Sequence, residues 1–198
     1  MSPATPRLRP AHVGWIEVIA GGMFSGKSEE LIRRLRRARI ARQEVQAFKP
    51  RLDQRYSPAD IVSHDENRIE STPVADAAEI RARLRRETQV LGIDEAQFLG
   101  PEIVPLCVEL ARGGLRVIVA GLDMDYRGEP FEPMPQLMAV AEEVTKIQAI
   151  CLVCGAPASH SQRIVPGKER VMVGAGEIYE PRCRAHFEPP ERERREDP

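Results

Sequence analysis

Gly21-Gly-Met-Phe-Ser-Gly-Lys-Ser28 is a complete G-x-x-x-x-G-K-[ST] pattern. The residues before it, 15–20, are rich in β-branched and aromatic side chains, and behind it Leu31, Leu35 and Ala38 recur at helical spacing. A strand, a glycine-rich loop and a helix in this order form the setting of a phosphate-binding loop. The stretch therefore predicts a nucleoside triphosphate site rather than a glycine turn before an ordinary helix.

The chemistry of the loop assigns a role to its main chain and to two side chains. Gly21 and Gly26 let the backbone curl so that successive N–H groups and the start of the helix face phosphate oxygens. Lys27 would reach the β- and γ-phosphates, and the Ser28 hydroxyl would bind Mg²⁺. The candidate phosphate-binding residues are Gly21, Gly22, Met23, Phe24, Ser25, Gly26, Lys27 and Ser28.

Length, composition and charge limit the class of protein. The 198 residues suit one medium domain, or one domain with a small appendage, and 42% of them are hydrophobic. No apolar run is long enough to cross a bilayer, and residues 1–10 lack a hydrophobic signal core, which predicts a cytoplasmic protein without membrane contact. A formal net charge of −1 provides no overall field that would attract nucleic acid.

Strand-like and helix-like segments alternate along the first 150 residues. The predicted strands are Trp15–Ala20, Glu44–Phe48, Val90–Asp94 and Leu115–Gly121. The predicted helices are Ser28–Gln43, Asp76–Glu87, Pro101–Arg112 and about Gln136–Glu143. Such alternation indicates an α/β fold with a mainly parallel sheet flanked by helices. Together with the phosphate loop, we expect a fold of the P-loop NTPase (RecA-like) type.

The character of the chain changes near residue 150, where cysteines, turns and short strands replace the alternation. We therefore expect an ATP-binding domain over residues 13–150 and a small second domain over 151–188, for which the cysteines discussed below predict zinc binding. Residues 1–12 and 189–198 are charged, carry prolines and are expected to be disordered tails.

A second nucleotide signal is the apolar run Val90-Leu-Gly-Ile, which ends in Asp94 and Glu95. An aspartate at the end of a parallel strand can hold Mg²⁺ through its water shell, and a neighbouring glutamate at the same sheet edge can accept a proton. Acids also end strands without any such role, but the phosphate loop upstream favours the functional interpretation. Asp53 and Arg55 could add a carboxylate near the metal and a charge near the phosphoryl group; on residues alone, a solvated charged loop is the simpler interpretation.

Two cysteine-containing pairs form a third signal. Cys151 and Cys154 are separated by two residues, as are Cys183 and His186, and 28 residues lie between the pairs. Three thiolates and one imidazole complete a tetrahedral zinc site, which makes structural Zn²⁺ the expected ligand. Disulfides suit a cytoplasmic chain poorly, and a redox C-x-x-C pair would be expected at a helix start. Cys107 lies on an apolar helix face and is expected in the core.

Several motifs in fixed order resemble those of the type II, zinc-containing thymidine kinases. They are Gly-Gly-Met-Phe-Ser-Gly-Lys-Ser-Glu-Glu-Leu (21–31), Lys-Pro-x-x-Asp-x-Arg-Tyr (49–56), Asp-Glu-Ala-Gln-Phe (94–98), Gly-Leu-Asp-Met-Asp-Tyr-Arg-Gly-Glu-Pro-Phe (121–131) and Gly-Ala-Gly-Glu-Ile-Tyr-Glu-Pro (174–181). With the cysteine pairs, the resemblance covers about residues 14–187.

The resemblance implies transfer of the γ-phosphoryl group of MgATP to the 5′-hydroxyl of thymidine, and of deoxyuridine. Glu95 would be the catalytic base, Asp53 and Asp94 would serve Mg²⁺ together with Ser28, and Arg55 would meet phosphate charge. The residues implied around the nucleoside are Met23, Phe98, Tyr126, Phe131, Ser161, Met172, Gly174 and Tyr179. Residues 161–179 would form a lasso loop over thymine. Feedback inhibition by dTTP and a homotetramer are also implied.

Three positions depart from the family pattern. Gly22 replaces a common proline, Ser161 replaces a common threonine, and Glu132 replaces a common glycine near the pocket rim. These changes bear on affinity and on the range of nucleosides accepted, because none of them removes a chemical role.

Two other classes of protein share the phosphate loop. A motor ATPase acting on DNA would use the cysteine pairs as a nucleic-acid contact, but the chain is short and nearly neutral. A nucleotide sensor would not need Glu95. Arginines cluster in residues 33–42 and 81–86 without interleaved aromatics, which favours solvated faces or subunit contacts over a nucleic-acid patch.

Overall fold

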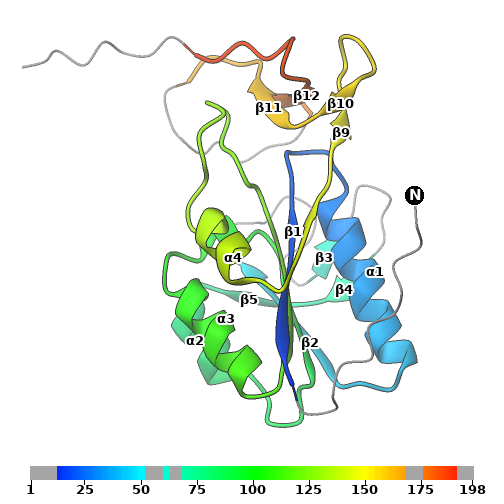
Figure 1. The fold of residues 1–198 in the computed structure, drawn as a ribbon, viewed down its shortest axis with the longest axis vertical. Coiled ribbons are helices and arrows are strands. Elements are labelled where there is room, and N and C mark those ends of the chain that lie inside the picture. The colour runs from blue at the N-terminus through cyan, green and yellow to red at the C-terminus, as the bar shows by residue number, and fades with distance from the viewer. Residues whose placement is uncertain (1–12, 52–59, 63–67, 168–175, 191–198) are drawn as a thin grey trace, which may run out of the picture.

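The computed structural model describes residues 13–51, 60–62, 68–167 and 176–190 (Figure 1). A six-stranded sheet in the order β5-β2-β6-β7-β1-β8 forms its centre, and every neighbouring pair in this sheet is parallel. The strands are β1 (Trp15–Ala20), β2 (Val45–Pro50), β5 (Thr72–Val74), β6 (Val90–Ile93), β7 (Arg116–Gly121) and β8 (Glu143–Lys146). The predicted α/β class with a parallel sheet is confirmed.

Helices cover both faces of the sheet (Figure 1). They are α1 (Lys27–Ile40), α2 (Ala77–Arg83), α3 (Ile103–Arg112) and α4 (Met134–Val140), and η1 (Ala96–Phe98) is a short 3₁₀ helix. Leu31 and Leu35 of α1 pack in one apolar cluster with Ile19. Ile103 of α3 packs in the other cluster, on the opposite face. This layering gives the sheet two buried faces.

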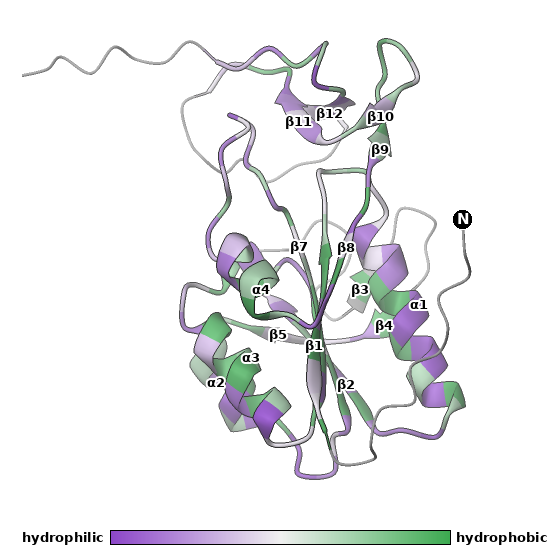
Figure 2. Ribbon diagram, in the orientation of Figure 1, coloured by the Kyte–Doolittle hydropathy of each residue, from purple (hydrophilic) through white to green (hydrophobic). Residues whose placement is uncertain are grey.

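Burial on both faces explains why the strands read as continuous apolar runs. Val18 and Ile19 are neighbours in β1, belong to different apolar clusters and are both fully buried. All four residues of β6 are buried as well. A strand with alternating polar residues would bury those polar side chains against one layer of helices. Strands of a parallel sheet covered on both faces are therefore apolar along their whole length. Figure 2 shows the central strands as the most hydrophobic part of the ribbon.

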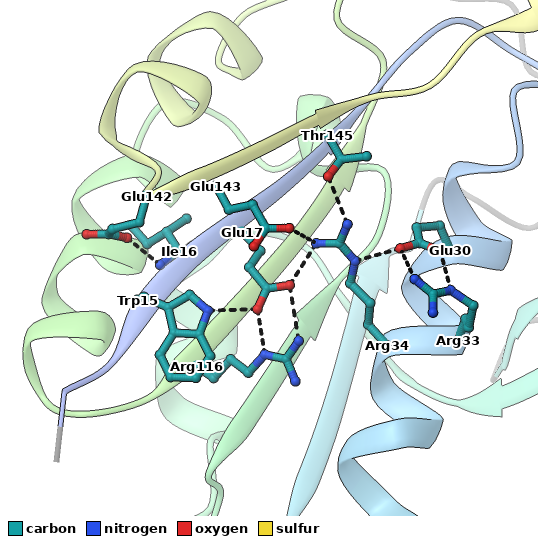
Figure 3. A network of polar contacts seen from close by, with 10 residues as sticks. All are labelled: Trp15, Ile16, Glu17, Glu30, Arg33, Arg34, Arg116, Glu142, Glu143 and Thr145. Carbon is teal, nitrogen blue, oxygen red and sulfur yellow. Dashed lines mark hydrogen bonds and ion pairs between the residues drawn. The ribbon is translucent and has the colours of Figure 1, made fainter. Parts of the chain in front are cut away.

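Glu17 is the polar exception in β1, and it is 3% exposed (Figure 3). Its carboxylate accepts hydrogen bonds from Trp15 Nε1 at 2.7 Å, Arg34 Nη1 at 2.7 Å and Arg116 Nε at 2.6 Å. Burial alone would raise the pKa of Glu17, but the hydrogen bonds and the charge of Arg116, with those from Trp15 and Arg34, lower it below its ordinary value. A buried carboxylate is therefore held ionised in the core.

The same network joins the helix that follows the phosphate loop to the sheet. Arg34 of α1 also donates to Thr145 Oγ1 at 2.9 Å and to Glu143 at 3.3 Å, both on the edge strand β8, and to Glu30 at 2.8 Å (Figure 3). One guanidinium thus connects α1, β1 and β8. The orientation of α1, which begins at Lys27, is fixed by this contact.

Three short antiparallel pairs complete the described fold. They are β3 (Asp60–Val62) with β4 (Arg68–Glu70), β9 (Ala149–Ile150) with β10 (Pro157–Ala158), and β11 (His160–Arg163) with β12 (Tyr179–Arg182). Figure 1 places the last two pairs beyond the carboxyl ends of the parallel strands. We call the described residues 149–167 and 176–188 the cysteine-bearing segment.

The boundaries of several elements differ from those predicted. The predicted helix 76–87 ends at Arg83, because Leu84 is extended and the Arg85 N–H donates to Gln46 Oε1 instead. The predicted helix 136–143 runs from Met134 to Val140, and Glu143 begins β8. Neither β5 nor β8 was predicted, since both are short and β8 is largely exposed at the sheet edge.

Candidate functional site

The phosphate loop connects the carboxyl end of β1 to the first turn of α1. Gly26, directly before the helix, has φ +85°, and Phe24 has φ +63°. A Cβ atom on Gly21 would lie 2.3 Å from the Ile147 carbonyl oxygen, so only glycine fits there. These conformations curl the loop just before the start of a helix, a setting that suits an anion.

Lys27 is held inside this loop. Its Nζ donates to the Gly22 carbonyl at 2.7 Å, and the Ser25 hydroxyl donates to the same oxygen at 2.8 Å. Lys27 is 7% exposed, and Ser28 behind it is half-buried in the first turn of α1. A cation at the mouth of a helix N-terminus complements the negative charge of a polyphosphate.

Asp94 and Glu95 lie at the carboxyl end of β6, two strands from β1 in the same sheet. They are 4% and 7% exposed, and Asp94 Oδ1 accepts the N–H of Glu95 at 3.0 Å. Glu95 adopts the left-handed conformation, with φ +48°, which turns the chain sharply into η1. Because all strands of the sheet are parallel, these carboxylates and the phosphate loop share one edge.

Gln97 orients the Glu95 carboxylate, a contact that the sequence interpretation missed. Its side-chain amide donates to Glu95 Oε2, and its Oε1 accepts the N–H of Leu122, beyond β7, at 3.0 Å. Gln97 is 5% exposed. Its place in the Asp-Glu-Ala-Gln-Phe motif was the available signal, but its partner Leu122 is 25 residues away and lies outside the motif.

The aromatic residues assigned to the nucleoside occur in two groups. Phe98 and Phe131 meet edge to face, with ring centroids 5.9 Å apart. Tyr126 and Tyr179 are connected by Arg163, whose guanidinium lies 3.6 Å from the Tyr126 ring centroid and donates to the Tyr179 hydroxyl at 3.0 Å. One face of Tyr126 is thus covered by a cation, and Arg163 is a second residue that sequence reasoning missed.

One further contact brings the predicted residues Met23 and Ser161 together. The Met23 N–H of the phosphate loop donates to the Ser161 hydroxyl on β11 at 2.9 Å. The hydroxyl that serine shares with threonine therefore has a partner. Four predicted site residues lie outside the described residues: Asp53, Arg55, Met172 and Gly174.

Cys151, Cys154, Cys183 and His186 converge in the cysteine-bearing segment, with all four potential ligand atoms within 4.8 Å of one another. Cys154 Sγ and Cys183 Sγ are 3.7 Å apart, beyond a disulfide bond, and Cys183 Sγ lies 3.2 Å from His186 Nδ1. Burial raises the pKa of the Cys151 thiol, but nearby main-chain N–H groups, that of Cys183 first, outweigh it and bring the pKa to about 6. Three thiol groups and one imidazole form a donor set that fits a tetrahedral metal ion.

Cys107 and His160 are both buried. Cys107 is fully buried on α3, and this burial raises the pKa of its thiol to about 12, as expected for a core residue. His160 is 6% exposed and stacks on Phe187 at a centroid distance of 4.4 Å. Burial lowers its pKa. No helix among the described residues combines the length and apolarity that a membrane span requires.

A curled phosphate loop, two buried carboxylates at the same edge of a parallel sheet and a Cys₃His cluster define a nucleotide-binding protein of the P-loop class with an added metal-binding unit. A sequence profile described as thymidine kinase matches residues 14–187. The chain belongs to the thymidine kinase family.

Two curated relatives are similar over most of their length. The chain is 64% identical over 178 residues to a protein named thymidine kinase from Rhodothermus sp. (strain ITI 518), which covers 90% of this chain and 83% of that protein. It is 58% identical over 176 residues to a protein named thymidine kinase from Bdellovibrio bacteriovorus, which covers 89% of this chain and 86% of that protein.

Proposed function

We propose that this protein transfers the γ-phosphoryl group of MgATP to the 5′-hydroxyl of thymidine. The observation that carries the proposal is the placement of the phosphate loop and Glu95 at one edge of a parallel sheet, on strands separated only by β7. Family membership supplies the acceptor, since both relatives are named thymidine kinases. A donor and an acceptor hydroxyl held at one edge can react in line, which is the main requirement of phosphoryl transfer.

The phosphate loop, residues 21–28, would hold the triphosphate through its N–H groups and Lys27. The Ser28 hydroxyl and the Asp94 carboxylate would hold Mg²⁺, since hard oxygen ligands suit this ion. When bound, Mg²⁺ neutralises phosphate charge. Asp53 and Arg55 are proposed for the same region on the family motif alone.

Glu95 would accept the proton of the 5′-hydroxyl as the oxygen attacks the γ-phosphorus. Its Oε2 atom accepts a hydrogen bond from Gln97, which restrains the carboxylate. The nearby Asp94 does not compete for this role in the proposal, because it serves the metal.

The proposed nucleoside pocket combines the two aromatic groups with Met23 and Ser161. Met172 and Gly174 would complete it from the lasso loop, residues 161–179, as the family motif implies. Deoxyuridine would enter the same pocket, because it differs from thymidine by one methyl group and pockets discriminate weakly against a missing methyl.

Structural Zn²⁺ is proposed for Cys151, Cys154, Cys183 and His186, because four thiolate and imidazole donors complete its tetrahedral shell. When bound, Zn²⁺ would clamp both ends of the lasso loop, which limits the ways the loop can open. We retain a domain boundary near residue 150 on this basis. Elemental analysis should find about one zinc per chain, and an active preparation free of zinc would overturn the site.

Several further assignments rest on the family resemblance. We propose feedback inhibition by dTTP, a homotetramer and a cytoplasmic location without a membrane partner. Nucleic acid is not a proposed partner, and the arginine contacts support this: Arg33 and Arg34 pair with Glu30, and Arg81 pairs with Glu109. Inhibition should appear as competition with both substrates, and its absence at saturating dTTP would remove the regulatory assignment.

Substitution of the proposed base tests the mechanism. Glu95→Gln should lower kcat by about 10³-fold, since general bases contribute about 10²–10⁴, while calorimetry shows unchanged binding of MgATP. Glu102→Gln is the matched control, because Glu102 is an exposed acid on the adjacent turn. Near-normal turnover in Glu95→Gln would exclude Glu95 as the base.

A further inference from the structure

The phosphate loop is packed against the cysteine-bearing segment and the residues leading into it. Gly21 lies so close to Ile147 that an added Cβ would meet its carbonyl oxygen at 2.3 Å. A Cβ on Gly22 would lie 3.2 Å from the Ser159 carbonyl oxygen. The Met23 N–H donates to Ser161 Oγ at 2.9 Å. Gly22 and Met23 therefore touch the cysteine-bearing segment, and Gly21 touches Ile147 just before it.

Phe24, the next residue, reaches the metal-binding cluster itself. Its half-buried side chain packs against a small apolar cluster of four buried residues. These are Ala149, Cys151, Ala158 and Cys183. Two of the four are members of the Cys₃His donor set. In Figure 1 the loop between β1 and α1 lies directly beneath β9 and β10, in agreement with these contacts.

The backbone of Phe24 indicates that this contact determines the shape of the loop. Phe24 has φ +63°, a left-handed conformation that costs a residue with a Cβ atom about 1 kcal/mol or more. Such a conformation persists only where surrounding contacts impose it. The two residues before it contribute the carbonyl that holds Lys27 and the N–H that binds Ser161. A change in the contacts of Phe24 would thus be transmitted to Lys27 and to the bond between the loop and Ser161.

We propose that Phe24 is a positioning residue that couples the Cys₃His metal site to the phosphate loop. Zinc, by ordering Cys151 and Cys183, fixes the apolar surface on which Phe24 rests, and Phe24 fixes the curl that binds polyphosphate. By linkage the effect is reciprocal, so a nucleotide in the loop strengthens the hold on the metal. The inference rests on the proposed zinc and ATP sites, and its readouts require neither thymidine nor turnover.

Zinc-loaded protein provides the test. Zinc transfer to a chromogenic chelator is timed with and without saturating MgADP, and MgADP affinity is measured by calorimetry. In the wild type, MgADP should slow zinc release about tenfold, a coupling of ordinary size. Phe24→Ala should weaken MgADP binding about tenfold, speed zinc release and abolish its response to MgADP. Phe24→Leu, which keeps most of the apolar contact, should retain most of the response.

Leu152→Ala is the matched control. Leu152 is an apolar residue between Cys151 and Cys154, and its exposed fraction is 67%. Leu152→Ala should leave the affinity for MgADP, the rate of zinc release and the effect of MgADP on that rate unchanged. Phe24→Gly separates backbone strain from packing, since glycine accepts the left-handed conformation without cost; it should behave like Phe24→Ala.

Two results would overturn the coupling. One is a Phe24→Ala variant that loses MgADP affinity while its zinc release keeps the wild-type response to MgADP. The other is a wild-type protein that binds both zinc and MgADP independently. A wild type that binds no zinc, or no MgADP, would instead refute the proposed function, so the two failures are distinguishable.

Discussion

The phosphate loop and the aromatic group of Tyr126, Arg163 and Tyr179 are positioned in different ways. The loop is a contiguous stretch whose main chain is shaped by its own left-handed residues and by close contact with Ile147. The aromatic group joins the turn after β7 to β11 and β12 through one guanidinium. Main-chain groups therefore form the proposed donor side, and side chains hold the proposed acceptor side.

This difference predicts that the interactions with the two substrates can be altered by different variants. Changes in the loop should affect ATP, whereas changes in the aromatic group should affect thymidine. Contacts that the two sides share, such as that of Met23 with Ser161, should affect both. The variants below follow from this comparison.

Lys27→Met should have the largest effect. The loss of the buried ammonium should lower kcat/KM for ATP by about 10³-fold, at the upper end for removal of one charge-stabilising donor. Thymidine binding, measured by calorimetry without ATP, should be unchanged. An equal loss of thymidine affinity would mean that the two sides are not held separately.

Gln97→Leu tests how the base is held between the two sides. Without the amide, Glu95 loses its link to Leu122, and kcat should fall by about 10²-fold, as expected for a misplacement of about 1 Å. The KM values for both substrates should change little. Gln97→Glu is a variant of matched size. It should shift the acidic limb of the kcat–pH profile to higher pH, because a second carboxylate beside Glu95 raises the pKa of Glu95. A KM effect without a kcat effect would contradict the positioning role.

Arg34→Met tests the anchoring of α1 behind the loop. The variant leaves Glu17 buried with fewer partners and should lower the free energy of unfolding by about 3 kcal/mol in urea titrations at pH 7. Because the folded-state pKa of Glu17 is lowered, its contribution is present above its ordinary value of 4.5 and is lost as pH falls through the folded-state pKa. The penalty of Arg34→Met should therefore shrink below pH 4.5.

Arg81→Met is the control for that measurement. Arg81 pairs with Glu109, but both side chains are more than half exposed. Its loss should cost much less than the loss of Arg34, because solvent screens an exposed ion pair. Equal penalties for Arg34→Met and Arg81→Met would contradict the assignment of a stabilising buried network.

Arg163→Met should have the smallest kinetic effect. It removes a desolvated cation–π contact of about 1.5 kcal/mol, and the KM for thymidine should rise about tenfold with the KM for ATP unchanged. Tyr179→Phe removes only the hydroxyl that accepts from Arg163, and it should raise the KM for thymidine less than Arg163→Met does. A rise in the KM for ATP would place Arg163 on the donor side.

Short sequence motifs were enough to predict the donor side of the site. The remaining features depend on contacts between residues far apart in the sequence and could not be predicted. The phosphate loop, the Asp94–Glu95 pair and the four metal-binding side chains were each readable because their chemistry lies in short motifs. Arg163 lies opposite Tyr179 only because β11 and β12 pair in that register. The arginine partners of Glu17 are 17 and 99 residues away, so a lone acid in an apolar strand could not reveal them. The strand β8 was missed for a related reason, since its exposed residues lack the apolar run of the inner strands.

The central claim is that the loop and Glu95 form one site for a donor and a small acceptor, and product analysis tests it most directly. Purified protein is incubated with MgATP and, separately, thymidine, deoxyuridine, deoxycytidine, deoxyguanosine or single-stranded DNA. Thymidine should induce ADP release matched mole for mole by thymidine 5′-monophosphate, with deoxyuridine next and no response to DNA. ADP release that depends on DNA, or that proceeds without a phosphorylated nucleoside, would contradict the account.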